Sequence, residues 1–205
     1  MMSRIFLTLT LSASLAACVS VLPNTAPASA VYRLSTSVQP IEKTSTAQII
    51  RVVRPSVTQL YNANKIVVTM DGQRLSTIAE AKWSEATPDM LQNAMIDSLE
   101  NSSQFIGLAP TAGAQAEAKL HLSVKNFEAS FDNGPESAPL AIVQYRATYV
   151  SAEDRSLLGT HTVRKTVRAD TINVSSIVAA IEQANGAAMA DIVQWLEAQK
   201  NSNRS

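Results

Sequence analysis

Few residues of this 205-residue chain have the chemistry for catalysis or metal binding. The chain has one cysteine, Cys18, and two histidines, His121 and His161. Each histidine lies in a segment of alternating polar and apolar residues, and neither has a carboxylate at metal-ligand or Ser-His-Asp-like spacing. We interpret both as solvated or hydrogen-bonded surface groups. So few ligands also exclude an all-protein zinc cluster.

The remaining candidate motifs favour turns over chemistry. Glu153-Asp154-Arg155 pairs two carboxylates, but adjacent residues at a loop tip diverge, which argues against general acid–base work. Asp132-Asn133-Gly134 starts like a calcium loop and lacks the later ligands. The sequence has no Gly-x-Ser-x-Gly, phosphate-binding glycine loop or His-Glu-x-x-His motif. We therefore predict that the protein is not an enzyme and has no catalytic residue, cofactor or metal.

The charge pattern bears on the kind of partner. The chain has 17 Lys+Arg and 17 Asp+Glu, so no global basic field attracts nucleic acid. A small basic group, Arg164, Lys165 and Arg168, lies at a predicted strand end, with Arg164 and Arg168 on one face and Lys165 on the other. It is a candidate for anionic headgroups, although a solvated strand edge is the simpler interpretation.

Cys18 follows a segment typical of an export signal. Arg4 supplies a positive charge, and Ile5 to Leu15 form an apolar stretch that is too short to span a bilayer, which needs about 20 residues. The small residues Ala16 and Ala17 suit a signal peptidase. The sequence thus predicts a signal peptide over residues 1–17, cleaved between Ala17 and Cys18.

Leu15-Ala16-Ala17-Cys18 resembles the lipobox of bacterial lipoproteins. The resemblance implies that Cys18 receives a diacylglycerol thioether and that its new amine is acylated, for example with palmitate. Several acyl chains anchor a protein stably to a membrane. The alternative is that Cys18 is only a small apolar residue in an ordinary signal peptide. Val19, where inner-membrane lipoproteins usually have Asp, favours the outer membrane over the inner.

The rest of the chain divides into a tether, one domain and a tail. Residues 18–30 form an uncharged, Pro-containing tether that spans at most ~40 Å. Residues 31–200 form the domain and residues 201–205 a polar tail. Hydrophobic residues make up 46% of the chain, enough for a sizeable core.

Strand and turn patterns dominate the domain. Asp71-Gly72 between two β-prone runs favours a two-residue hairpin turn of type I′, in which both central residues have positive φ. A shift in the alternation predicts a bulge near Asn126. A hydroxyl-rich loop covers 35–47, and 105–106 begins a return to the sheet. The other predicted strands cover 31–34, 48–53, 65–70, 73–82, 119–131, 141–150 and 157–168.

Two helices complete the prediction. Thr87-Pro88-Asp89 opens the first, with Thr87 as the cap. The second starts at Ser175 or Ser176 and has a long apolar face from Ile177 to Trp195. Trp83 and Trp195 are interpreted as core or helix-packing residues. The predicted fold is a single α+β domain, with two principal helices packed on a mixed, largely antiparallel sheet.

The order of these features resembles the ABC-type transport auxiliary lipoproteins. That family includes the lipoprotein of the paraquat-inducible system, which accompanies transporters that carry mammalian-cell-entry (MCE) domain proteins. The most compact motif is the AKW…P…L…L block inside the Tyr61 to Phe105 segment. The other matching stretches are Tyr32-Arg33-Leu34, Ile50 to Pro55, Lys119–Phe131, 141–168 and the terminal helix that ends in Trp195-Leu196.

The resemblance implies a membrane-anchored, periplasm-facing component without catalysis of its own. Its expected partners are an MCE-domain protein and the ABC permease and ATPase of the same system, and its expected cargo is a lipid or apolar solute moving between membranes. A homo-oligomeric ring is also implied. Two alternatives stay open: an outer-membrane assembly lipoprotein that partners a β-barrel, as in lipopolysaccharide assembly, and a lipoprotein enzyme with perturbed titratable groups in a pocket.

Overall fold

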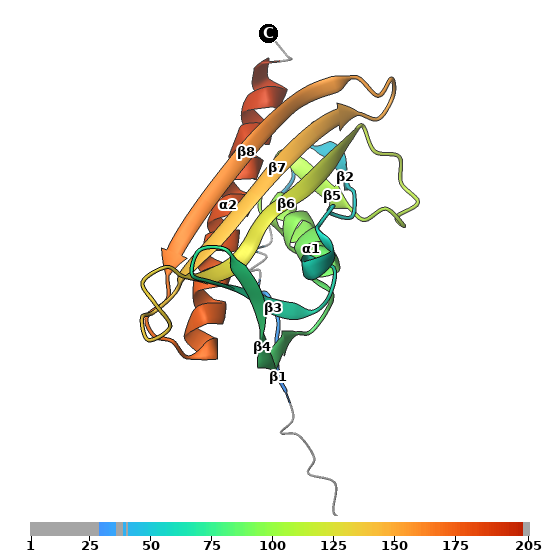
Figure 1. Cartoon of the computed structure of the whole chain (residues 1–205). Helices are drawn as coiled ribbons and strands as arrows, with labels where there is room; N and C mark the ends of the chain where they lie inside the picture. The colour runs from blue at the N-terminus through green and yellow to red at the C-terminus, as the bar shows by residue number, and fades with distance from the viewer. Residues whose placement is uncertain (1–28, 36–38, 40, 203–205) are drawn as a thin grey trace, which may run out of the picture.

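Strands and helices account for most of the chain in the computed structural model, which describes residues 29–35, 39 and 41–202 (Figure 1). Cys18, the predicted signal peptide and most of the predicted tether lie outside these residues. The elements in chain order are β1 (Ala30–Tyr32), β2 (Gln48–Val52), the 3₁₀ helix η1 (Gln59–Tyr61), β3 (Lys65–Met70), β4 (Arg74–Trp83), α1 (Thr87–Glu100), β5 (Phe105–Leu108), β6 (Ala118–Phe131), β7 (Leu140–Ser151), β8 (Leu157–Arg168) and α2 (Val174–Ser202).

The eight strands form one mixed sheet around β6. One edge of β6 pairs along its length with antiparallel β7, which pairs in turn with antiparallel β8. The other edge is shared by two parallel strands. β2 pairs with the start of β6, where Ile50 lies opposite Ala118, and β3 pairs with its end, where Val68 lies opposite Ala129. This arrangement, with two α-helices, confirms the predicted α+β domain.

The shared edge of β6 divides the sheet into two branches. The β2–β5 branch is parallel, whereas β3, β4 and β1 form the other branch. Between them, Ser56 forms an isolated bridge to Ser123, so the middle of β6 is also hydrogen-bonded. α1 lies in the opening between the two branches (Figure 1). The fork therefore creates the space that α1 fills.

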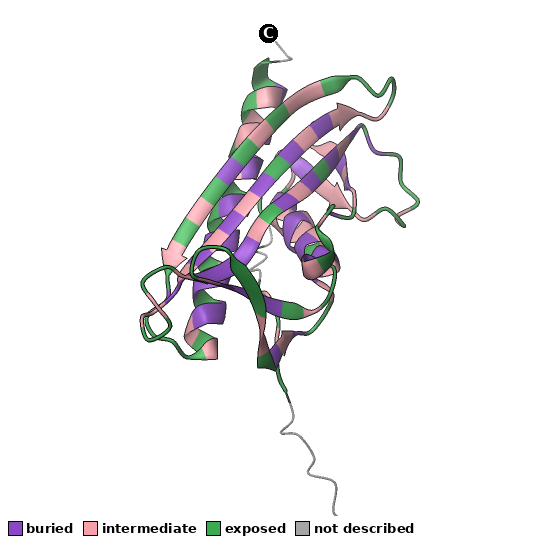
Figure 2. Cartoon of the chain, viewed as in Figure 1, coloured by how far each residue is buried: buried purple, intermediate pink, exposed green. Residues whose placement is uncertain are grey.

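The long strands β6, β7 and β8 have one buried and one open face. The odd-numbered residues of β7 from Val143 to Tyr149 are buried, and the residues between them are partly or fully exposed (Figure 2). The register of β6 against β7 shifts between Val124 and Asn126, which confirms the predicted bulge. The bulge restores the alternation, because an extra residue returns the next apolar side chain to the core face.

α2 covers the buried face of these strands, as its apolar periodicity predicts. Ile181, Ala188 and Ile192 are fully buried on it, and burial of each large apolar side chain contributes about 1.5–3 kcal/mol. Trp195 is only half-buried and lies against Gly159 of β8. A Cβ on Gly159 would lie 3.0 Å from the indole ring, so glycine permits this close approach.

The start of α1 corrects one sequence prediction. Ala86 occupies the cap position, and Thr87 is the first helical residue. The Thr87 hydroxyl donates a hydrogen bond to the carbonyl oxygen of Ala63 at 3.0 Å instead of capping the helix. It thus fixes the start of α1 to the loop that precedes β3. Asp89 lies in the first turn, where a negative charge stabilises the helix dipole.

The hairpin between β3 and β4 has the predicted turn. Asp71 and Gly72 have φ values of 53° and 71°, and the Gln73 amide donates to the Met70 carbonyl at 3.3 Å. The loop is one residue longer than predicted, because Met70 pairs with Arg74. A β-branched residue tolerates positive φ poorly, whereas glycine has no Cβ to clash.

We expect Gly72→Val to lower the free energy of unfolding by about 1–2 kcal/mol, the cost of left-handed backbone at a residue with a Cβ. Chemical denaturation measures this change. The matched control is Gly113→Val, because Gly113 also has open space around its Cβ position but no positive φ. Equal stability of the two variants would show that backbone strain at the turn is absent.

Candidate functional site

A cavity of about 380 Å³ lies between α1 and α2. Small residues of α2, Gly186 and Ala190, leave room there between the helices. Serine, amide and carboxylate groups supply most of the remaining lining. The cavity is lined by Ser35, Ser98, Asn101, Ser102, Gly186, Ala190, Val193, Gln194 and Glu197.

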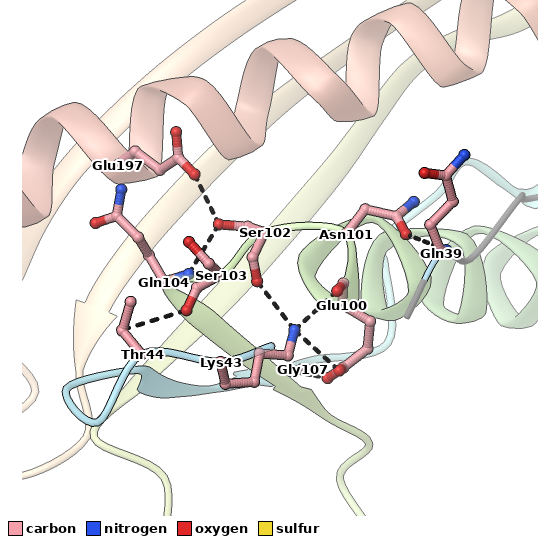
Figure 3. Close-up of polar contacts among 10 residues, drawn as sticks. All are labelled: Gln39, Lys43, Thr44, Glu100, Asn101, Ser102, Ser103, Gln104, Gly107 and Glu197. Atoms are coloured by element: carbon pink, nitrogen blue, oxygen red, sulfur yellow. Dashed lines mark hydrogen bonds and ion pairs between the residues drawn. The ribbon is translucent and has the colours of Figure 1, made fainter. Parts of the chain in front are cut away.

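A polar network includes Ser102 and Glu197 of the cavity lining and joins them to neighbouring residues (Figure 3). The Lys43 ammonium donates to the carbonyl oxygens of Glu100 at 2.8 Å and Ser102 at 2.9 Å. It also forms an ion pair with the Glu100 carboxylate at 3.1 Å. The other oxygen of that carboxylate accepts a hydrogen bond from the Gly107 amide at 3.0 Å. Lys43 and Glu100 thus tie the end of α1 to β5 and to the segment that leads into β2.

Ser102 carries this network to α2. Its buried hydroxyl donates to the Glu197 carboxylate at 2.6 Å, and the Gln104 amide donates to the same hydroxyl oxygen at 3.2 Å. Lys200, one turn further along α2, donates to the carbonyl oxygens of Thr46 and Gln104. Ser102 thus has a side-chain carboxylate and a backbone amide as partners, and none of the described hydrogen bonds joins a histidine to this pair. Through these bonds the network joins the end of α1 to β5 and α2.

A second cluster pairs a histidine with a carboxylate. His161 Nε2 on β8 lies 2.7 Å from Asp191 Oδ1 on α2, and Lys165 Nζ lies 2.6 Å from Asp191 Oδ2. The His161 ring stacks on Trp195, with centroids 5.3 Å apart. Asp191 comes from α2, 30 residues along the chain, so the contact fits the interpretation of His161 as a hydrogen-bonded group and arises without a carboxylate at short sequence spacing. Hydrogen bonds from Lys165 and then His161 lower the pKa of Asp191.

The His161 cluster lacks the third member of a catalytic triad. Among the hydrogen bonds of the described residues, none joins a hydroxyl or thiol to His161. Stacking on Trp195 also covers one face of the ring. The cluster therefore fastens β8 to α2. Sequence spacing could not reveal it, because the contact joins a strand to a helix that crosses it.

The other predicted site residues lie where the sequence placed them. His121 is exposed on β6, and Glu153-Asp154-Arg155 form the turn before β8. Hydrogen bonds from Ser151 and Ser156 lower the pKa of Asp154 to about 2. The Asp154 carboxylate therefore stabilises the turn by accepting these hydrogen bonds. Asp132 is held by Arg168, with contacts of 2.5 and 2.8 Å. The described part of the chain contains no group of three metal-ligating side chains.

A buried polar pair was missed from the sequence. The Tyr61 hydroxyl of η1 donates to the Glu128 carboxylate of β6, and the Asn126 amide donates to the other Glu128 oxygen at 3.0 Å. Burial, followed by the hydrogen bond to Glu128, raises the pKa of Tyr61. The pair secures η1 over the bulge of β6. Glu128 interrupts an apolar run in the sequence, which is the signal that could have indicated a buried acid.

None of the described helices combines the length and apolar character needed to cross a bilayer.

The comparisons define the class of protein. The family model of the ABC-type transport auxiliary lipoprotein component matches residues 32–193, so this chain belongs to that family. The family is one of membrane-anchored periplasmic lipoproteins associated with ABC transport, and no enzymatic family is indicated. A search of curated proteins finds no match.

Solved structures share the fold. Protein XCC0632 from Xanthomonas campestris has a TM-score of 0.75 at 19% identity, covering 85% of this chain and 98% of that one. An uncharacterized protein has a TM-score of 0.67 at 12% identity, covering 82% and 99%. The hypothetical protein CT253 from Chlamydia trachomatis has a TM-score of 0.50 at 9% identity, covering 74% and 96%. At these identities the likeness concerns the fold alone.

We expect Asp191→Asn to lower the free energy of unfolding by about 1 kcal/mol at neutral pH, because two charge-assisted hydrogen bonds at a half-exposed site are weakened. The pKa of Asp191 is lower in the folded chain than in the unfolded chain. The stabilisation is therefore complete above the unfolded pKa of about 4 and is lost as the pH falls through the lowered folded value.

The measurement is the melting temperature of both proteins between pH 7 and pH 3. The difference between them should be largest at neutral pH and should shrink below pH ~4. Asp170→Asn is the control, since Asp170 is exposed and its carboxylate has no ion pair among the described residues. A constant difference at every pH would contradict the role given to the Asp191 charge.

Proposed function

We propose that this chain is the lipid-anchored, non-catalytic auxiliary component of an ABC transport system that carries MCE-domain proteins, and that the system moves a lipid or apolar solute between membranes. The observation that carries the proposal is the family match over residues 32–193, which covers most of the described domain. The partners in this proposal are the MCE-domain protein and the ABC permease and ATPase.

The polar chemistry of the domain supports a binding role. In the interhelical cavity, the Ser102 hydroxyl lies 2.6 Å from the Glu197 carboxylate. Next to the cavity, the Glu100 carboxylate is bonded to Lys43 and to the Gly107 amide. These bonds join the end of α1 to β5 and α2. A protein that works by holding partners needs only a stable surface, and these contacts supply the stability.

The proposed anchor is Cys18, after cleavage of residues 1–17. The predicted tether over residues 18–30 then leads into the family domain, with Ala30 already paired in β1, and α2 continues to Ser202 within the predicted tail of residues 201–205. A tether of at most ~40 Å keeps the domain close to the bilayer. We place the anchor in the outer membrane, on the basis of Val19 after the modified cysteine.

A homo-oligomeric ring is part of the proposal. β5 and β8 each pair with one neighbour among the described strands, so each has an outer backbone edge that another chain can reach. A ring of such domains could surround the passage of an apolar solute.

We expect mass spectrometry of the mature N-terminus to show an acylated Cys18. Cys18→Ala should leave the domain folded, because every described core residue lies between Ile50 and Leu196, but should release it from the membrane fraction. A free thiol at Cys18, or cleavage elsewhere, would contradict the anchor.

Cross-linking in membranes followed by purification of this chain should recover an MCE-domain protein. His161→Gln and Asp154→Ala should recover it equally well and should retain membrane-barrier function, because neither residue is proposed to react. Recovery of a β-barrel assembly protein instead would favour the outer-membrane assembly alternative. Loss of function in either variant, with folding and partner capture intact, would indicate a reaction.

A further inference from the structure

Charge is segregated between the two sides of the domain. α1 and α2 together contain six acidic residues and one basic residue, Lys200. The strands β6, β7 and β8 together contain six Lys+Arg and one acidic residue, Glu128. The whole chain has a formal net charge of zero, which conceals this separation.

Most of the strand cations lie on the face that α2 leaves open. Figure 1 views this face, with β6, β7 and β8 in front of α2. Arg146 projects from it, because its neighbours Tyr145 and Ala147 are buried on the α2 side. The register places Arg146 opposite Ser123 and Thr162, and Arg164 opposite Gln144 in the next outward-facing row. Lys119 and Lys125 of β6 extend the basic character along the same strands. We call this surface the basic sheet face.

The cations of the basic sheet face are not neutralised. Among the described ion pairs, none includes Lys119, Lys125, Arg146 or Arg164. The single acid of these strands, Glu128, is buried and already bonded to Tyr61 and Asn126. Arg168, at the end of β8, is paired with Asp132 and is therefore excluded from the set. Four cations without a carboxylate partner among the described residues thus share one surface, and Arg164 donates a hydrogen bond to the neutral side chain of Gln144 at 3.2 Å.

The remaining side chains suit a broad polar surface. Thr160, Thr162 and Thr166 are exposed along β8, and they are short hydroxyl groups that leave the cations accessible. Adjacent cations lie roughly 8–13 Å apart by strand geometry, so they are spread over the face rather than gathered around one ligand. At the rim, Leu157 is 64% exposed, the highest value among the large apolar side chains described.

We infer that the basic sheet face docks on an anionic phospholipid bilayer. Distributed cations on an open surface match a distributed anionic charge, and an exposed leucine at the rim can enter the headgroup region. The proposed anchor at Cys18 would keep the domain within reach of the same surface, so a weak attraction would suffice. The inference rests on the proposed function in one respect, because the proposed Cys18 anchor brings the domain to the membrane. Binding of the basic sheet face to a bilayer can be tested without the anchor.

The test uses residues 19–205, which retain every described core residue and lack Cys18. Co-sedimentation with vesicles of phosphatidylcholine containing 30% phosphatidylglycerol should show binding that falls steeply between 50 and 500 mM NaCl. Vesicles of phosphatidylcholine alone should bind much less. Because each Lys or Arg near an anionic bilayer contributes about a five-fold factor, Arg146→Gln/Arg164→Gln should weaken binding about 25-fold.

The matched control is Arg33→Gln/Lys65→Gln, which removes the same charge from exposed positions outside the basic sheet face. It should bind nearly as well as the unaltered domain. Equal loss in both double variants would overturn the inference, since only net charge would then matter. Unchanged vesicle binding in Arg146→Gln/Arg164→Gln, with loss of partner capture by the full chain, would identify an acidic protein as the occupant and would also overturn it. Failure of Cys18 acylation or MCE capture would leave the vesicle result unaffected, so the two proposals fail separately.

Discussion

The backbone edge of β6 is the constraint on which the rest of the fold depends. A 14-residue strand presents more hydrogen-bonding groups than either short parallel partner can satisfy. β2 satisfies the first part, β3 the last, and the bridge from Ser56 to Ser123 part of the middle. Because two strands with different partners leave β6 in different directions, the sheet forks and α1 occupies the fork. The interhelical cavity exists because α1 in this position lies against α2.

Polar contacts hold α2 on the sheet at intervals along its length. Asn185 accepts the hydroxyl of Tyr145 at 2.6 Å, Asp191 pairs with Lys165, and Lys200 reaches the carbonyl oxygens of Thr46 and Gln104. Burial raises the pKa of Tyr145 and raises that of Tyr149 to about 12, so both hydroxyls stay protonated as donors. These directional bonds select one register of a helix whose small apolar residues could otherwise slide. Thr69 Oγ1 is the sole buried side-chain polar atom without a partner in the described chain.

Local features were predictable from the sequence because their causes are local. Asp71-Gly72 had to form its turn, since few other residues accept positive φ, and the bulge near Asn126 was visible as a change of alternation. The branching at β6 was not predictable, because nothing in a strand's own sequence states which distant strands share its edge. For the same reason His161 could be placed on a strand but not beside Asp191. The Thr87 cap was predicted wrongly because the Thr87 hydroxyl donates its hydrogen bond to a distant acceptor, the Ala63 carbonyl oxygen.

The fork also sets the order in which the chain can acquire its structure. β6, β7 and β8 are successive antiparallel strands and pair through short connections, whereas Ile50 must find Ala118 and Val68 must find Ala129, more than 60 positions away. Loop-closure entropy makes such distant parallel pairings slow. Synthesis delivers β1 to β5 first, yet the two branches lack the edge on which to assemble until residues 118–131 follow. The two branches in the N-terminal half of the domain, which adjoins the proposed anchor, therefore assemble on the sheet only after β6 has formed with β7 and β8 in the C-terminal half.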